Sequence, residues 1–106
     1  MRTLLFFDLP SITLKEKKHY RDFVKYLKVL GFYRLQESVF CKMDIDKQAM
    51  DSSIKRIESK LPPEGSVIAL SVTEKQFSTM KILLGDIETD VINSDERVIM
   101  LWKKFL

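Results

Sequence analysis

Residues 3–16 read TLLFFDLPSITLKE and combine, in this order, a buried strand, a turn and the start of a helix. The run TLLFF at its start is continuously apolar, which is typical of a central strand covered on both faces. Asp8 ends this run, and Pro10 restricts the residue before it, which favours a turn. Thr13 and Glu16 have the spacing of a capping box, in which each side chain accepts a hydrogen bond from the other residue's backbone N–H. The segment therefore predicts a strand–turn–helix unit.

The helix is expected to run from about residue 14 to residue 30, with Gly31 as the glycine that ends it. Apolar residues recur along it every three or four positions and predict one buried stripe. This stripe consists of Tyr20, Phe23, Val24, Leu27 and Leu30. The cations form a separate flanking stripe, which consists of Lys17, Arg21, Lys25 and Lys28. A basic stripe of this kind is either a solvated helix face or the footprint of a protein that binds a polyanion.

Shorter apolar patterns and the turns between them define the remaining elements. In chain order they are strands at 32–36 and 38–43, a helix at about 47–60, a buried strand at 67–72, a turn or short helix at 74–79, and candidate strands at 80–84 and 98–101. Asp44 or Asp46 is expected to cap the second helix, and Cys41 to be a small core residue. The second helix is expected to bury Met50, Ile54, Ile57 and Leu61.

The order β-α-β-β-α-β matches the α+β, ferredoxin-like plan, in which one antiparallel sheet carries two helices on one face. We expect a ferredoxin-like domain at 1–85, followed at 86–106 by a polar linker and a C-terminal strand. This extra strand has no place in a four-stranded sheet. It would be covered if it joined the exposed sheet edge of a partner subunit, and dimerisation would also help a domain this small.

Composition narrows the class of protein further. The chain has 106 residues and a mass of 12.5 kDa, with 45% hydrophobic and 31% charged residues, which fits one folded domain and excludes a disordered chain. No apolar run approaches the ~20 residues that span a bilayer, so we expect no membrane partner. The single cysteine fits a reducing cytoplasm. The net charge is +3, but residues 1–60 carry +5 (13 Lys and Arg against 8 Asp and Glu), so the positive charge is concentrated in this half.

Most catalytic motifs are absent. One histidine, one cysteine and no glycine-rich phosphate loop make a zinc site, a Cys–His pair or a nucleotide-phosphate loop unexpected. Asp8 is the outstanding carboxylate, because it interrupts an apolar strand just before a tight turn. It either caps that turn through its side chain or serves as an oxygen ligand for Mg²⁺. One aspartate per chain is a poor metal site, and two copies related by a two-fold axis make a better one.

Five short motifs, taken in order and spacing, resemble the CRISPR-associated protein two family, in its type II-A branch. They are FDLP (7–10), YRDF (20–23), RLQESVF (34–40), LPPEGSV (61–67) and TEKQF (73–77). The resemblance covers nearly the whole chain, including the late strand. It implies the ferredoxin-like fold and a symmetric homodimer in which the C-terminal strands join the partner's sheet.

Two functions follow from this resemblance. The first is spacer acquisition, in which the homodimer lies between two dimers of the CRISPR integrase and holds a protospacer DNA duplex by its backbone. The second is a magnesium-dependent endonuclease that cleaves single-stranded RNA or double-stranded DNA, and Asp8 matches the aspartate that carries this activity. A third class, a regulatory or toxin-like domain of the same fold, agrees with the size of the chain but does not explain the full set of motifs.

The resemblance also marks candidate site residues. Arg34, Gln36, Ser38 and Phe40 match an R-x-Q-x-S-x-F run that lies near the cleft in nuclease-active members of the family. Core packing of Phe40 and a surface ion pair of Arg34 are the structural alternatives. The residues expected to contact nucleic acid are Lys17, Arg21, Lys25, Lys28 and Arg34. Since the sequence shows neither a recognition helix nor a platform of stacking aromatics, binding is expected to be directed at phosphates and nearly independent of sequence.

Overall fold

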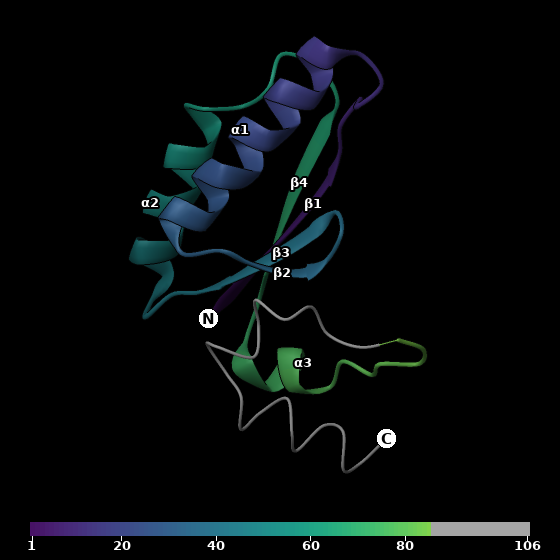
Figure 1. Cartoon of the computed structure of the whole chain (residues 1–106). Helices are drawn as coiled ribbons and strands as arrows, with labels where there is room; N and C mark the ends of the chain where they lie inside the picture. The colour runs from purple at the N-terminus through teal and green to yellow at the C-terminus, as the bar shows by residue number, and fades with distance from the viewer. Residues whose placement is uncertain (86–106) are drawn as a thin grey trace.

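The computed structural model describes residues 1–85, which form one sheet with helices on both of its faces (Figure 1). The elements are β1 (Arg2–Asp8), α1 (Leu14–Leu30), β2 (Tyr33–Gln36), β3 (Val39–Met43), α2 (Lys47–Glu58), β4 (Ser66–Val72) and α3 (Glu74–Ser78). The four strands pair antiparallel in the order β2-β3-β1-β4. This confirms the α+β class, and the arrangement is compatible with the ferredoxin-like plan. None of the described helices is long and apolar enough to cross a membrane.

The start of α1 agrees with the sequence pattern. Thr13 is the N-cap, its side chain accepts a hydrogen bond from the backbone N–H of Glu16, and the Glu16 carboxylate accepts one from Thr13, at 3.1 and 2.9 Å. The helix ends at Gly31, whose φ of +103° lies in the left-handed region that favours glycine. Both predicted ends of α1 are confirmed.

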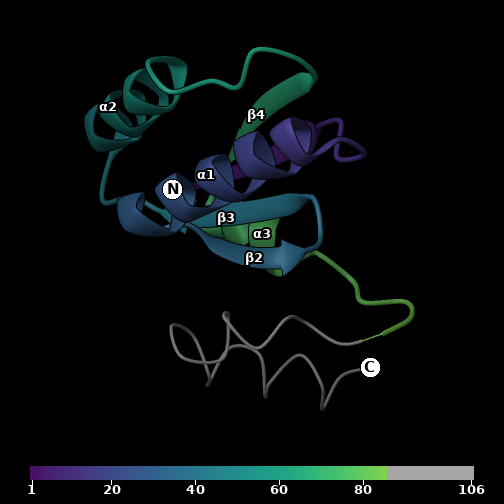
Figure 2. The same cartoon turned by 45° about the horizontal axis from the view of Figure 1, so that its top comes forward.

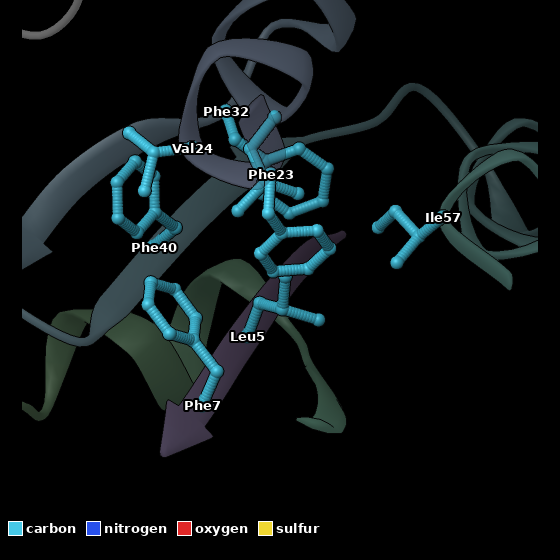
Figure 3. Close-up of a cluster of buried hydrophobic side chains, with 8 residues drawn as sticks. Leu5, Phe7, Phe23, Val24, Phe32, Phe40 and Ile57 are labelled. Atoms are coloured by element: carbon cyan, nitrogen blue, oxygen red, sulfur yellow. The ribbon is translucent and has the colours of Figure 1, made fainter. Parts of the chain in front are cut away.

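The main core lies between the sheet and the two long helices. Phe7 is at its centre, with ring centroids 5.6 Å from Phe23 and 5.5 Å from Phe40. Figure 3 shows the side chains of this cluster, which is formed by Leu5, Phe7, Phe23, Val24, Leu27, Phe32, Phe40 and Ile57. The buried stripe predicted for α1 therefore faces this core. The predicted core position of Cys41 is confirmed on the opposite face of the sheet, where burial raises the pKa of its thiol.

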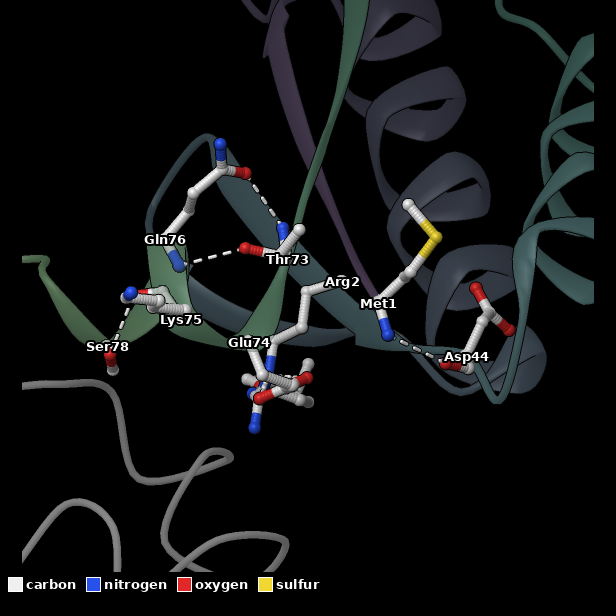
Figure 4. A network of polar contacts seen from close by, with 9 residues as sticks. Met1, Arg2, Asp44, Thr73, Glu74, Lys75, Gln76 and Ser78 are labelled. Atoms are coloured by element: carbon white, nitrogen blue, oxygen red, sulfur yellow. Dashed lines mark hydrogen bonds and ion pairs between the residues drawn. The ribbon is translucent and has the colours of Figure 1, made fainter.

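The short helix α3 covers that opposite face (Figure 2), where Phe77 packs against Tyr33, Leu35 and Cys41. Arg2, only 3% exposed, holds this helix in place. Its Nε donates to both carboxylate oxygens of Glu74 at 3.0 and 3.1 Å, and its guanidinium lies 4.2 Å from the Phe77 ring centroid (Figure 4). Burial lowers the pKa of Arg2, but the neighbouring Tyr33 and Glu74 raise it, and the net shift is upward.

Four expectations need correction or lie beyond the described residues. The strand at 67–72 was expected to be buried, but β4 is an edge strand with Ile68 and Leu70 60% and 51% exposed. Residues 80–84 do not form a strand, because the chain leaves α3 without returning to the sheet. The second helix ends at Glu58, so Leu61 lies outside it and is exposed. The strand predicted at 98–101 lies outside the described residues.

The structure shows which of the two expected aspartates caps the start of α2. The Asp46 side chain accepts a hydrogen bond from the backbone N–H of Ala49 at 2.8 Å. Asp44 is buried instead, where its carboxylate pairs with Lys42. Asp46 is therefore the N-cap.

Candidate functional site

Asp8 is the last residue of β1 and lies opposite Ser66 of β4 in the strand pairing. It is exposed, as a residue that meets a ligand must be. The loop that enters β4 passes directly beside it, because a Cβ added to Gly65 would lie 2.6 Å from the Asp8 carbonyl oxygen. Strand pairing and this close backbone contact therefore fix the position of Asp8.

Asp8 provides one carboxylate per chain. Among residues 1–85, no group of three or more histidine, cysteine or carboxylate side chains lies close enough together to hold a metal ion. Mg²⁺ binds through one or two carboxylates and completes its shell with water and phosphate oxygens. A single Asp8 therefore fits this chemistry only when a second carboxylate or a bound phosphate supplements it.

Four of the five predicted phosphate-contacting residues meet at one groove of about 500 Å³, and we refer to it as the basic groove. It lies between α1 and the edge strand β2. Its lining consists of Tyr20, Arg21, Val24, Lys25, Lys28, Val29 and Arg34, with no acidic residue among them. Lys17 is exposed on α1 but does not line the groove. The helical stripe and the strand residue thus converge, although they are separated in the sequence.

Arg34 is the member of the basic groove that comes from the sheet. Its guanidinium lies 5.2 Å from the centroid of the Phe40 ring, within the range of a cation–π contact. Its Nε is buried and has no hydrogen-bond partner among the described residues. A buried donor without a partner is costly, and this nitrogen is covered by the protein itself.

The other residues of the R-x-Q-x-S-x-F run are dispersed. Phe40 is 0% exposed and belongs to the main core, so it cannot line a cleft in this chain. Gln36 is exposed at the end of β2. The backbone carbonyl of Ser38, in the turn between β2 and β3, accepts a hydrogen bond from the backbone N–H of Phe7 at 3.1 Å, which attaches this turn to the end of β1 near Asp8.

Sequence reasoning missed two kinds of residue. The apolar members of the basic groove, Val24 and Val29, give no sign of a ligand site, because the first reads as core and the second as an isolated exposed residue. The role of Gly65 was missed as well. Its position directly after Pro62-Pro63-Glu64 and before a strand was the available signal, since the turn there needs a residue that tolerates positive φ.

Comparison with known proteins identifies close relatives. The family model described as CRISPR associated protein Cas2 matches residues 1–80. A protein named CRISPR-associated endoribonuclease Cas2 from Treponema denticola is 45% identical over 101 residues, which cover 95% of this chain and 100% of the relative. Proteins of the same name from Streptococcus mutans and Ligilactobacillus salivarius are 40% and 45% identical, and the matches cover 99% and 95% of this chain and 96% and 100% of those relatives.

Proposed function

Because the chain belongs to the CRISPR associated protein Cas2 family, we propose that it is a nucleic-acid-binding subunit of CRISPR adaptation, the process that acquires new spacers. In this proposal it acts as a cytoplasmic homodimer that bridges two dimers of the CRISPR integrase and holds a protospacer duplex by its backbone. Its assignment to the type II-A branch stays a prediction.

The observation that carries this proposal is the basic groove. Arg21 and Lys25 are one turn apart on α1, where like charges destabilise a helix by about 0.2–0.5 kcal/mol per pair. Lys28 of α1 and Arg34 of β2 also line the groove, and no carboxylate does. A polyanion backbone would compensate such a cluster of positive charge.

The exposed edge of β4 supports the homodimer. Within the described residues β4 pairs only with β1, and Ile68 and Leu70 are exposed on it. An apolar edge strand of this kind is normally covered, since it can pair with another chain. We propose that the strand predicted within residues 86–106 of the partner covers it.

A salt titration of duplex affinity tests the nucleic-acid proposal. Each lost phosphate contact lowers the slope of log K against log salt by about 0.9 for duplex DNA. The variant Arg21→Ala/Lys25→Ala should therefore flatten the slope by about 2 per chain and weaken the binding of two unrelated duplexes alike. The matched control is Lys47→Ala/Lys55→Ala, which removes two exposed cations from α2 and should leave the slope nearly unchanged. If both variants change the slope equally, the basic groove is only a solvated face.

A second candidate function is a magnesium-dependent endonuclease that cleaves single-stranded RNA or double-stranded DNA. Two observations favour it: Asp8 is exposed at the end of β1, and the relatives are named endoribonucleases. We propose that two Asp8 carboxylates, one from each protomer, hold one Mg²⁺, which would polarise the scissile phosphate and activate a water molecule. In this proposal the chain supplies the carboxylates and holds the nucleic-acid strand in the basic groove.

The endonuclease proposal is tested by incubating the purified protein with RNA and with duplex DNA, in Mg²⁺ or in EDTA. Cleavage should require Mg²⁺ and should be lost in Asp8→Asn, which is expected to fold normally because residue 8 is exposed. The control is Asp51→Asn, which changes an exposed aspartate of α2. Cleavage that survives in Asp8→Asn, or that EDTA does not affect, would contradict this assignment.

A further inference from the structure

A second hollow, of about 310 Å³, lies beside Asp8 and is separate in chemistry from the basic groove. It is bounded by the loop between β1 and α1, the first turns of α1, and the loop that enters β4. We call it the proline cleft, because Pro10, Pro62 and Pro63 all line it and the chain contains no other proline. Three prolines from two distant segments give this cleft rigid apolar walls, since each ring fixes its own backbone φ.

Tyr20 provides a flat aromatic wall of the proline cleft. Its ring is held by an edge-on contact with Phe7, with centroids 5.9 Å apart. Its hydroxyl donates a hydrogen bond to the backbone carbonyl of Glu37 at 3.3 Å. The ring is therefore held in place before any ligand binds, which reduces the entropy cost of binding.

The polar groups of the proline cleft are mixed in sign, unlike those of the basic groove. Lys15 and His19 line it together with Glu16 and Glu64. Glu16 already accepts hydrogen bonds from the backbone N–H groups of Thr13 and Ile12. Glu64 is therefore the carboxylate available to an exocyclic amino group, the kind of pairing that Glu makes with cytosine, while Lys15 suits a phosphate.

The proline cleft lies next to both candidate sites, Asp8 and the basic groove. Leu9 and Pro10, which line it, directly follow Asp8 in the chain. Tyr20 lines both the proline cleft and the basic groove. The two hollows therefore adjoin at Tyr20.

We propose that the proline cleft binds one unpaired nucleobase of a nucleic acid whose backbone lies in the basic groove, and this rests on the proposed nucleic-acid function. A volume of about 310 Å³ is at the lower limit of small-ligand sites, which suits a single nucleoside and excludes a base pair. Apolar and aromatic walls stack bases of any sequence, and Glu64 adds a preference for a base with an exocyclic amino group.

The test uses single-stranded oligonucleotides that carry one 2-aminopurine, whose fluorescence is quenched or enhanced when its stacking changes. The wild-type protein should change the fluorescence on binding. His19→Ala/Pro63→Ala removes two walls of the proline cleft but leaves the Tyr20 ring, so it should reduce this change and weaken single-strand binding by at most about tenfold, while duplex affinity and its salt slope stay as in wild type. The matched control is Lys18→Ala, an exposed neighbour that lines neither hollow and should leave the fluorescence change intact.

The outcomes separate this proposal from the function on which it rests. If duplexes bind through the basic groove but the cleft variant keeps the fluorescence change and the single-strand affinity, only the proline cleft proposal is overturned. If the cleft variant instead loses binding to the CRISPR integrase with single-strand binding unchanged, the cleft is a protein-docking site and the proposal is also overturned. Failure of the wild-type protein to bind any nucleic acid overturns the proposed function and this inference together.

Discussion

At the scale of single residues, Gly65 passes the end of β1 so closely that a side chain does not fit. Its φ is +103°, and an added Cβ would be 2.6 Å from the Asp8 carbonyl oxygen and 2.7 Å from Cδ2 of Leu9. The first contact is with backbone that is fixed by strand pairing, so it cannot be relieved by rotating a side chain. Gly65 therefore acts on Asp8 as a positioning residue.

We expect Gly65→Ala to destabilise the fold by more than the ~1–2 kcal/mol that a left-handed conformation costs an ordinary residue. Gly85→Ala is the matched control, because Gly85 also has a positive φ, +86°, but no atom of residues 1–85 lies within 4 Å of its added Cβ. The control should cost only about 1–2 kcal/mol. Urea denaturation of both variants measures the difference, and equal losses would mean that the close approach to Asp8 is relieved at no cost.

Glu16 makes the stability of the start of α1 depend on pH. The Thr13 backbone N–H donates to its carboxylate and lowers its pKa below the ordinary value of 4.5, and the N–H of Ile12 contributes in the same direction. Because the folded pKa is lower than the unfolded one, this stabilisation is complete above about pH 4.5 and is lost as the pH falls through the folded value.

The variant Glu16→Gln should therefore have a lower melting temperature than the wild type at pH 6, and the two should converge towards pH 3. Thermal unfolding at a series of pH values checks this. Glu58→Gln serves as the control, because Glu58 is at the C-terminal end of α2, and it should show no such convergence. A Glu16→Gln difference that stays constant with pH would exclude the capping carboxylate as its origin.

At the scale of elements, local signals predicted α1 well and β4 poorly. The capping box at Thr13 and the glycine at position 31 are determined by the backbone of α1 itself, so they are visible in the sequence. The run VIALSV has the same apolar character in a central strand and in an edge strand. Its place in the sheet depends on pairing with distant β1, and this pairing has no local signal.

The packing of α3 also depends on a contact between distant residues, which has no local signal in the sequence. A turn or short helix was predicted at 74–79, but the buried Arg2 that holds it was not, since an arginine beside a predicted strand normally reads as exposed. The charge of Arg2 is tolerated because Glu74, Tyr33 and Phe77 surround it. These contacts join the start of β1 to α3 and β2, which are far from it in the sequence, and only the folded structure brings them together.

Glu74→Gln should destabilise the fold by about 1–2 kcal/mol, because it removes the countercharge of a buried guanidinium. The Glu74 side chain is half exposed, which keeps the effect modest. Lys75→Gln is the control, since Lys75 is an exposed neighbour on the same helix, and we expect a change within about 0.5 kcal/mol. Chemical denaturation compares the two, and equal stabilities would show that the ion pair contributes nothing.

At the scale of the whole molecule, the sequence predicts the site residues that lie on one element better than those that meet through folding. Arg21, Lys25 and Lys28 share one side of α1, so helical periodicity was enough to group them. Arg34 reaches the same groove only because β2 lies beside α1, and only the family motif marked it as a site residue. A paired Asp8 site depends on a second chain, beyond the reach of any pattern within one sequence.

The dimer proposal predicts that the β4 edge cannot tolerate a charge. Leu70→Lys should give a folded monomer, because residue 70 is already 51% exposed within one chain and its substitution leaves the core intact. Ile12→Lys makes the same change at a residue that is 87% exposed in the loop before α1 and should remain dimeric. Analytical ultracentrifugation measures the masses, and a dimeric Leu70→Lys protein would show that another surface forms the interface.

Mixed dimers test whether the proposed nuclease needs one Asp8 or two. Wild-type and Asp8→Asn chains are unfolded together, refolded at different ratios and assayed for magnesium-dependent cleavage. If both carboxylates share one Mg²⁺, only dimers with two wild-type chains are active, so activity follows the square of the wild-type fraction. An equal mixture should then retain about a quarter of the activity, whereas independent sites would retain about half. The control mixture contains wild-type and Asp51→Asn chains and should keep full activity, because residue 51 lies on α2, away from the end of β1. A linear dependence on the wild-type fraction would mean that each Asp8 acts alone, with phosphate and water completing the metal shell, and that the two-fold axis is needed only to hold the nucleic acid.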